Sequence, residues 1–389
     1  MTDYKLVQAE LIDWLTQNEE KVLDGTFPKF HAILADPPYA LPGGFMNKKW
    51  DQFSSPQAYQ AWVTEWASLL LKFVYPGAVG MFFGGTRTVH RLTSGLEDAG
   101  WEIADCLMYL YGSGFPKNHS FRRVGEAWEG HGTALKPAYE PVVLARAPRD
   151  GTYAQCATKY GTSALNVDGA RIPANGEETA RVNSGAKGNG YLYGASVTYD
   201  SETHPAGRWP ANVILDDVAA AALDAQSGER PAGGAVTGNE PSYTGKTGIY
   251  GTMGRQKWEP YQDGGGPSRF FYTSKASTWE RTAGMDERSN HPTVKPADLT
   301  RYLATLLLPP ELDESRRILV PFAGIGSEML GAILAGWDSV VGIEQSEDYI
   351  TQAHKRLAWW SQFDSIEAAK KAYQQEQKRA KEVVEWFTS

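Results

Sequence analysis

Two short segments combine residue types that could do chemistry with the backbone features of a ligand site. The first is Asp36-Pro37-Pro38-Tyr39, which ends a short apolar run from Phe30 to Ala35. The two prolines fix the backbone and remove N–H donors, so their carbonyl oxygens can accept hydrogen bonds from an outside group. Asp36 adds a carboxylate acceptor, and Tyr39 adds a flat aromatic face. Together these groups suit an exocyclic amine on a planar ring.

The second segment is a glycine turn, Phe322-Ala323-Gly324-Ile325-Gly326, between an apolar run and a helical pattern that begins at Ser327. Glycines let the backbone approach a ligand, and the start of a helix offers free N–H groups at the positive end of its dipole. Eighteen residues after Gly326, the next strand pattern ends in Glu344. A carboxylate there can accept hydrogen bonds from both hydroxyls of a ribose, which predicts a cofactor that contains a nucleoside.

Alternating strand and helix patterns surround both segments. Strands are predicted over 30–35, 78–83, 101–109, 141–145, 317–321 and 339–343, and helices over 55–73, 89–99, 295–308, 327–335 and 347–360. Between these two runs, residues 151–267 hold 20 of the 40 glycines and one helical pattern, from Asp216 to Gln226. The alternation predicts one parallel α/β sheet that is built from both flanks of the glycine-rich segment.

Composition limits the class of protein. The chain has 389 residues, of which 42% are hydrophobic, so it can form two domains or a large core with an insertion. Two cysteines cannot make a disulfide framework or a four-thiolate zinc site, and the seven histidines form no i, i+4 pair, so no metal is expected. No apolar run reaches the roughly 20 residues of a membrane span, and no secretory signal is visible, so a cytoplasmic protein is expected. The net charge of −8 does not exclude nucleic acid, because a basic cleft on an acidic protein gives the same sum.

The two segments and their order resemble the amino-methyltransferases of DNA, which transfer a methyl group from S-adenosylmethionine to the exocyclic nitrogen of adenine or cytosine. That family carries the Asp-Pro-Pro-Tyr tetrapeptide and a Phe-x-Gly-x-Gly turn. In its permuted beta group the tetrapeptide comes first, a target-recognition segment follows, and the turn comes last. This chain has that order, together with the group's further cofactor-side motif, His291-Pro292-Thr293-Val294-Lys295-Pro296. The segments 207–212 and 269–272 also resemble bacteriophage and prophage members.

The resemblance implies a fold and a division of the chain. The fold is a doubly wound, mostly parallel α/β sheet of the S-adenosylmethionine-dependent methyltransferase type, circularly permuted, with an inserted recognition region. The catalytic half of the core covers 1–150, the recognition insertion 151–267, the cofactor half 268–363 and a charged C-terminal helix 364–389. The strands that end at Asp36 and Pro321 are expected to lie side by side, with their carboxyl ends at one crevice.

The resemblance also assigns roles to individual residues. The catalytic residues are Asp36, Pro37, Pro38 and Tyr39. The cofactor contacts are Asp36, His291, Thr293, Lys295, Pro296, Phe322, Ala323, Gly324, Gly326, Ser327 and Glu344. A loop similar to the family's base-pocket loop adds Lys117, Asn118, His119, Arg122 and Arg123 as DNA contacts. Tyr39 is expected to receive a flipped base by stacking, while Asp36 and the Pro37 carbonyl accept hydrogen bonds from its amine. S-Adenosylhomocysteine is the expected product, and no metal takes part.

Two departures from the family pattern stand out. Ala9-Glu10 occupies the place where members often have Gly-Asp, and the cofactor turn has Ile325 where a serine is common. Adenine N6 is the expected target, because aspartate at the first position of the tetrapeptide is commoner among the adenine enzymes of this family. Cytosine N4 is the alternative, because the same pocket chemistry serves it.

Other classes fit the sequence less well. RNA and protein methyltransferases usually place the glycine turn before the Pro-Pro motif, and a catalytically inactive DNA-binding module would have a damaged motif. A nicotinamide oxidoreductase would need a third glycine where this chain has Met329. The sequence leaves open the recognition site, a homodimer, and a nuclease partner in a restriction-modification system.

Overall fold

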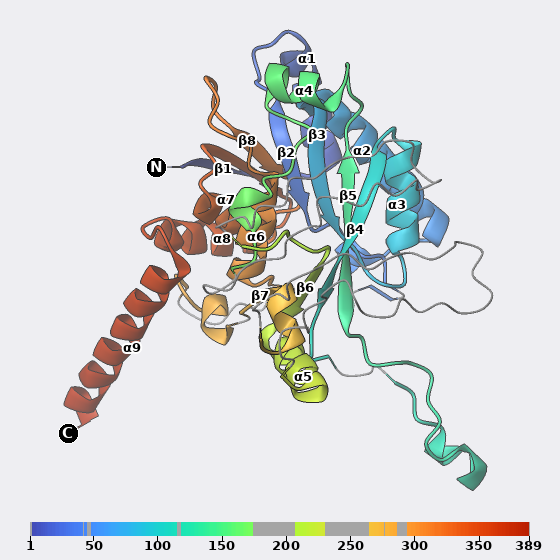
Figure 1. Ribbon diagram of the computed structural model, residues 1–389, viewed down its shortest axis with the longest axis vertical. Coiled ribbons are helices and arrows are strands. Elements are labelled where there is room, and N and C mark those ends of the chain that lie inside the picture. Colours follow the sequence, from blue (N-terminus) through green and yellow to red (C-terminus); the bar gives the residue numbers. More distant parts are fainter. Residues whose placement is uncertain are drawn as a thin grey trace, which may run out of the picture.

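The computed structural model describes residues 2–41, 43–44, 48–114, 118–173, 207–229, 264–275, 277–285 and 294–388. Within them the sheet has nine strands in the order β1-β9-β8-β2-β3-β5-β4-β6-β7 (Figure 1). The strands are β1 (Asp3–Gln8), β2 (Phe30–Ala35), β3 (Val74–Phe83), β4 (Glu102–Leu110), β5 (Tyr139–Arg146), β6 (Val213–Asp216), β7 (Tyr272–Ser274), β8 (Arg317–Val320) and β9 (Ser339–Glu344). Neighbouring strands are parallel except at β5, which is antiparallel to β3 and β4. The predicted mostly parallel α/β sheet is therefore confirmed.

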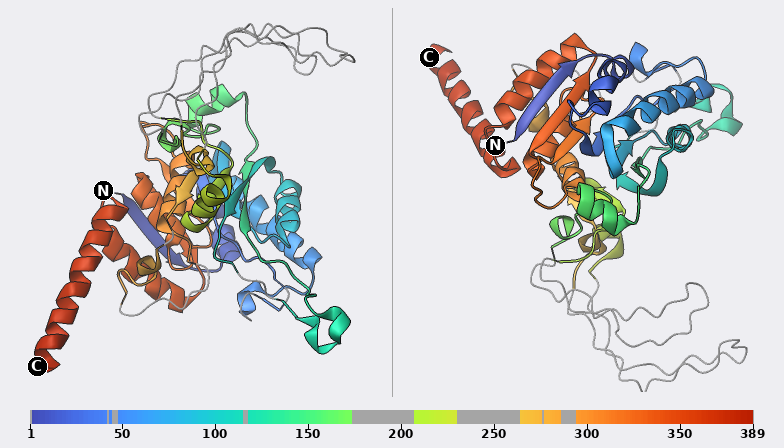
Figure 2. Two further views of the ribbon diagram at one scale, coloured as in Figure 1. Left: turned by 60° about the horizontal axis from the view of Figure 1, so that its bottom comes forward. Right: turned by 90° about the horizontal axis from the view of Figure 1, so that it is seen from above.

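Helices cover both faces of this sheet (Figures 1 and 2). They are α1 (Leu11–Leu23), α2 (Pro56–Phe73), α3 (Val89–Asp98), α4 (Tyr153–Tyr160), α5 (Asp217–Ser227), α6 (Ala297–Leu307), α7 (Ser327–Ala335), α8 (Glu347–Trp360) and α9 (Ile366–Thr388). Among the residues that the structure describes, no helix is both long enough and apolar enough to cross a membrane.

The central strand β2 shows how the core is divided into two layers. Its side chains alternate, so Ala32 and Leu34 pack with α6, α7 and α8 on one face. Ile33 and Ala35 pack with α1, α2 and α3 on the other face. All six residues of β2 are buried, which explains why its sequence is a continuous apolar run without alternation. The strand therefore holds Asp36, which follows it, in a fixed place.

The glycine-rich segment 151–267 contributes to the sheet as well as to the loops. Its predicted helix is present as α5, which ends at Ser227. The strand β6 lies just before α5 and pairs in parallel with β4, and β7 then pairs with β6. Sequence patterns did not predict β6, a strand of four residues within the glycine-rich segment. Part of the segment 151–267 is therefore built into the sheet.

The contact between α6 and α7 leads to a prediction on stability. A Cβ atom at Gly331 in α7 would lie 2.4 Å from the carbonyl carbon of Thr300 in α6. Alanine would favour the helix by itself, so any net loss of stability can be assigned to this contact. We expect Gly331→Ala to lower the free energy of unfolding by about 1–3 kcal/mol, the usual cost of overpacking. Denaturant unfolding measures the change, and an unchanged or higher stability would contradict the close packing.

Candidate functional site

The two motifs lie side by side in the sheet. The strands β2 and β8 are parallel neighbours, with Ala32 opposite Ile318 and Ile33 opposite Leu319. Because parallel strands end at the same edge of a sheet, Asp36 and Pro321 emerge next to each other. This pairing confirms the adjacency that was predicted from the sequence.

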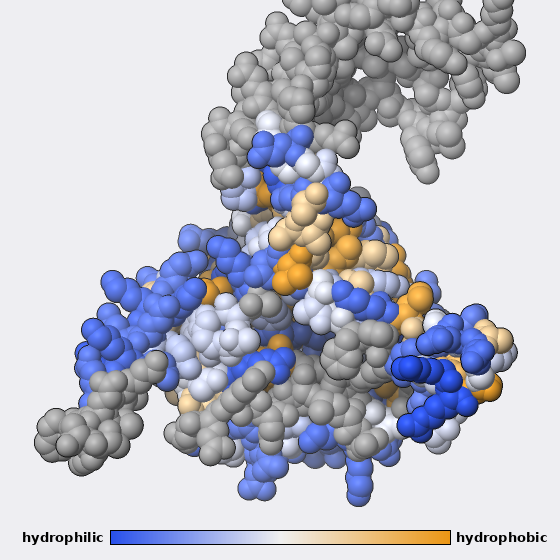
Figure 3. Space-filling model, turned by 90° about the horizontal axis from the view of Figure 1, so that it is seen from below, coloured by the Kyte–Doolittle hydropathy of each residue, from blue (hydrophilic) through white to orange (hydrophobic). Residues whose placement is uncertain are grey.

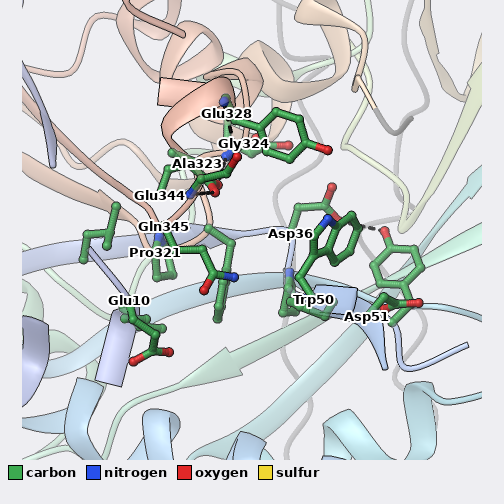
Figure 4. Close-up of a pocket in the computed structure, with 18 of the residues that line it drawn as sticks. Glu10, Asp36, Trp50, Asp51, Pro321, Ala323, Gly324, Glu328, Glu344 and Gln345 are labelled. Atoms are coloured by element: carbon green, nitrogen blue, oxygen red, sulfur yellow. Dashed lines mark hydrogen bonds between the residues drawn. The ribbon is translucent and has the colours of Figure 1, made fainter. Parts of the chain in front are cut away.

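A pocket of about 310 Å³ opens at this edge (Figure 4). Its wall is formed by the ends of β1, β2 and β9, the glycine turn after β8 with the start of α7, and the segment from Trp50 to Phe53. Trp62 of α2 and Tyr349 of α8 complete it. In Figure 4, Glu344 and Gly324 lie on one side of the pocket and Asp36 and Trp50 on the other. A ligand in the pocket would therefore contact both motifs at once.

Glu344 is held rigidly at the end of β9. Its Oε2 atom accepts a hydrogen bond from the backbone N–H of Gly324 at 2.8 Å, and its Oε1 atom accepts one from Ser346 N–H at 2.8 Å. Burial raises the pKa of Glu344, while these N–H groups act against the rise. Each carboxylate oxygen has a second lone pair, so the group can still accept hydrogen bonds from two hydroxyls of a ligand.

Asp36 belongs to a buried network of four side chains. Lys295 Nζ lies 3.1 Å from Asp36 Oδ2 and 2.9 Å from Glu140 Oε1. The Tyr39 hydroxyl oxygen lies 2.7 Å from Asp36 Oδ1 and 2.6 Å from Glu140 Oε1, and it accepts a hydrogen bond from Lys295 Nζ at 2.9 Å. A single O–H group can donate to only one of the two carboxylates at a time. The ammonium group of Lys295 offsets one of the two negative charges that Asp36 and Glu140 carry when both are ionised.

The pKa values of this network follow from burial and from these contacts. Burial raises the pKa of Asp36, and the charge of Lys295 acts in the opposite direction. Burial alone would lower the pKa of Lys295, but Asp36 and Glu140 raise it above its usual value. Burial and the two carboxylates raise the pKa of Tyr39 well above its usual range, so its hydroxyl stays neutral and can donate. The site thus presents a carboxylate that is prepared to accept a hydrogen bond.

Comparison with known proteins identifies the family. The family model described as DNA methylase (N6_N4_Mtase) matches residues 30–355, which include both motifs. The chain belongs to the DNA methylase family. No curated protein matches the chain.

Solved structures of similar proteins include several DNA methylases. M1.HpyAVI in complex with SAM is 13% identical, with 91% of this chain and 100% of that chain covered and a TM-score of 0.42. TTHA0409 from Thermus thermophilus, a protein described as a putative DNA modification methylase and complexed with S-adenosyl-L-methionine, is 12% identical, with 93% and 95% covered and a TM-score of 0.43. PvuII DNA methyltransferase, described as cytosine-N4-specific, is 12% identical, with 96% and 92% covered and a TM-score of 0.46.

Most of the residues that the sequence of this methylase assigns to catalysis or to the cofactor meet in the pocket. Asp36, Pro37, Pro38, Tyr39, Phe322, Ala323, Gly324, Ser327 and Glu344 line it. Gly326 caps the start of α7 with a φ of 81°, a conformation that favours glycine. Lys295 is not part of the pocket wall. Its ammonium group lies behind the wall, in contact with Asp36, Tyr39 and Glu140. Pro296 immediately precedes α6. His291, Thr293 and Lys117 lie outside the described residues.

The other residues assigned to DNA lie on an arm, residues 118–138, between β4 and β5. The arm projects from the sheet (Figures 1 and 2). Hydrophilic side chains lie on it beside the exposed hydrophobic residues Val124, Trp128 and Leu135 (Figure 3). Asn118 closes it, because its Oδ1 atom accepts hydrogen bonds from the backbone N–H groups of Thr133 and Ala134. His119, Arg122 and Arg123 are on its surface. The arm therefore extends outward from the core, and these residues do not line the pocket.

Sequence analysis did not identify the wall of the pocket that residues 50–53 form. Asp51 is fully buried and accepts hydrogen bonds from the N–H groups of Ala40 (2.7 Å) and Leu41 (3.1 Å), which fold the segment after the tetrapeptide back on itself. Trp50 and Phe53 consequently face the pocket. The sequence signal that could have indicated this wall is the acid Asp51 between the aromatic residues Trp50 and Phe53, soon after the tetrapeptide.

Proposed function

We propose that this protein transfers a methyl group from S-adenosylmethionine to the exocyclic N6 of adenine in DNA. The observation that carries the proposal is the pocket in which Asp36 and the glycine turn face each other, in a chain of the DNA methylase family. S-Adenosylhomocysteine and a proton from the amine are the other products.

The lining of the pocket fits this cofactor. It includes the carboxyl groups of Glu10, Asp36, Asp51, Glu328 and Glu344, and its described residues include no lysine, arginine or histidine. Such a lining suits a ligand with a sulfonium and an ammonium group, and it disfavours the phosphates of a dinucleotide. Glu344 would hold the ribose hydroxyls beside the N–H groups of the glycine turn. When bound, S-adenosylmethionine supplies an electrophilic methyl group.

The residues of the chain then have distinct tasks. Asp36 and the Pro37 carbonyl accept hydrogen bonds from the amine and orient its lone pair towards the cofactor pocket. Positive charge develops on that nitrogen during transfer, so a fixed carboxylate stabilises the transition state. The Tyr39 ring offers a stacking face for the flipped base. Lys295 keeps Asp36 ionised and therefore acts through it as a positioning residue.

Parts of the chain outside the pocket are proposed to bind DNA. The region 151–267 would select the target sequence, because it is rich in glycine and aromatic residues and lies between the two motifs. The arm carries Arg122 and Arg123 on its surface, where they can contact phosphates. The root of the arm is β5, whose Glu140 contacts Tyr39, so DNA held by the arm would be connected to the catalytic network.

A direct assay tests the proposed function. The protein is incubated with S-adenosylmethionine labelled in its methyl group and with unmethylated DNA, and the DNA is then digested to nucleosides. Label in N6-methyldeoxyadenosine is expected. Label in N4-methyldeoxycytidine would show that cytosine, not adenine, is the target base. Absence of label from both nucleosides, with DNA of varied sequence, would contradict the proposal.

The role of Glu344 leads to a prediction on cofactor affinity. Glu344→Ala removes the acceptor for the ribose hydroxyls and leaves the N–H groups of Gly324 and Ser346 without their partner. We expect S-adenosylmethionine binding to weaken by about 1–3 kcal/mol, as when charged hydrogen bonds are lost. Calorimetry measures the affinity, with the exposed Asp348→Ala as a control. An unchanged affinity would remove Glu344 from the cofactor site.

A further inference from the structure

Glu328 is a buried carboxyl group of the pocket that the proposed mechanism does not use. It is the second residue of α7, it lines the pocket beside the glycine turn, and it is 3% exposed. Its Oε1 atom has no hydrogen-bond partner among the residues that the structure describes. A buried carboxyl oxygen without a partner costs free energy, so this position calls for a functional explanation.

The charged groups around Glu328 come from three elements. Asp36 follows β2, Lys295 precedes α6, and Arg356 lies in α8. Lys295 contacts Asp36 and Glu140, while Arg356 donates hydrogen bonds to Ser327 Oγ at 2.9 Å and to the Ile325 carbonyl at 3.3 Å. Lys295 is thus paired with other groups, whereas Arg356 keeps Nε and Nη2 without a hydrogen-bond partner among the described residues. A positively charged group of a ligand in the pocket could therefore interact with the Glu328 carboxyl group.

Resting on the proposed function, we propose that Glu328 recognises the positive charge at the reacting end of the cofactor. The pocket would then favour the sulfonium of S-adenosylmethionine over the neutral thioether of S-adenosylhomocysteine. The two ligands differ by one methyl group and one charge, and the charge is the larger difference in a site of low dielectric. Glu328 is therefore a specificity-determining residue that helps the product to leave after transfer.

The titration of Glu328 supports this role. Burial, and then the neighbouring Asp36, raises the pKa of Glu328 to about 8, while Lys295 and Arg356 act against the rise. At pH 7 the group therefore carries a proton in the protein alone. A cation in the pocket favours the carboxylate and lowers this pKa, so a proton leaves when a cationic ligand binds. Binding of a ligand with a neutral thioether releases fewer protons from Glu328.

Calorimetry with two stable ligands tests the proposal. S-Adenosylhomocysteine has a neutral sulfur at the reacting position, and sinefungin has an amine-bearing carbon there. We expect Glu328→Gln to weaken sinefungin about ten-fold relative to S-adenosylhomocysteine, because only sinefungin carries a positive charge at the reacting position. The exposed Glu347→Gln, at the start of α8, serves as the control and should leave the ratio unchanged.

Two results would overturn the proposal. Equal weakening of both ligands by Glu328→Gln would leave their affinity ratio unchanged and would show that Glu328 has no role in charge recognition. A second measurement uses the wild-type protein and therefore does not require the variant to fold. It compares the protons released when each ligand binds at pH 7, from calorimetry in buffers of different ionisation enthalpy. Equal release with both ligands would also contradict the proposal. Failure of the wild-type protein to bind either ligand would instead overturn the proposed function itself.

Discussion

Replacing Asp36 by alanine is expected to remove most methyl transfer while DNA binding remains nearly unchanged. The carboxylate follows the fully buried strand β2 and is held by Lys295 and Tyr39. It interacts most strongly with the amine when positive charge develops, so its loss affects the transition state more than the bound substrate. Removing one such preorganised group typically lowers turnover by about 10²–10³. DNA affinity comes mainly from phosphate contacts elsewhere and should persist.

Three measurements separate this mechanism from a loss of folding. Single-turnover kinetics gives the rate of transfer, a DNA-binding titration gives the affinity, and thermal melting reports on stability. Asp36→Asn is the matched variant, because it keeps the size and one acceptor oxygen but removes the charge. We expect it to lie between the wild type and Asp36→Ala in rate. A folded Asp36→Ala protein that transfers methyl groups at the wild-type rate would end the proposed mechanism.

The arrangement of the core could be predicted because local patterns and one general rule were sufficient. Continuous apolar runs indicated β2 and β8, and the rule that ligands bind at the carboxyl ends of parallel strands placed Asp36 beside Pro321. The strands β6 and β7 were not predicted, because their places in the sheet depend on tertiary contacts. The strand β6 pairs with β4, and β7 pairs with β6.

The catalytic network was harder to predict because it joins distant parts of the chain. Tyr39 and Glu140 are 101 positions apart, and Lys295 is 256 positions from Tyr39. Sequence reasoning gave Tyr39 a stacking face and Lys295 a cofactor contact, since motif membership does not show which way a side chain points. The structure shows the Tyr39 hydroxyl bonded within the network and the Lys295 ammonium at Asp36. Both functions therefore depend on packing between β2, β5 and the segment before α6.

Replacing Lys295 by methionine is expected to shift the pH dependence of methyl transfer. Asp36 must be ionised to accept the amine hydrogen bond, and its pKa is already raised by burial. Lys295 acts against that rise, so its removal raises the pKa of Asp36 further. The ionised fraction then falls at neutral pH and recovers as the pH increases. The acid limb of the rate profile should therefore move to higher pH, and at pH values below the raised pKa the rate should fall by about ten-fold for each unit by which the pKa shifts.

The same substitution could instead act through stability, and the profile distinguishes the two effects. Removing one partner of a buried ion pair typically costs about 3–5 kcal/mol, so folding of Lys295→Met is first checked by thermal melting. Lys295→Arg retains a positive charge and should keep the acid limb near its wild-type position. Lys371→Met, an exposed substitution in α9, should leave rate and profile unchanged. A folded Lys295→Met protein whose rate is lower by the same factor at every pH would show that Lys295 does not control the ionisation of Asp36.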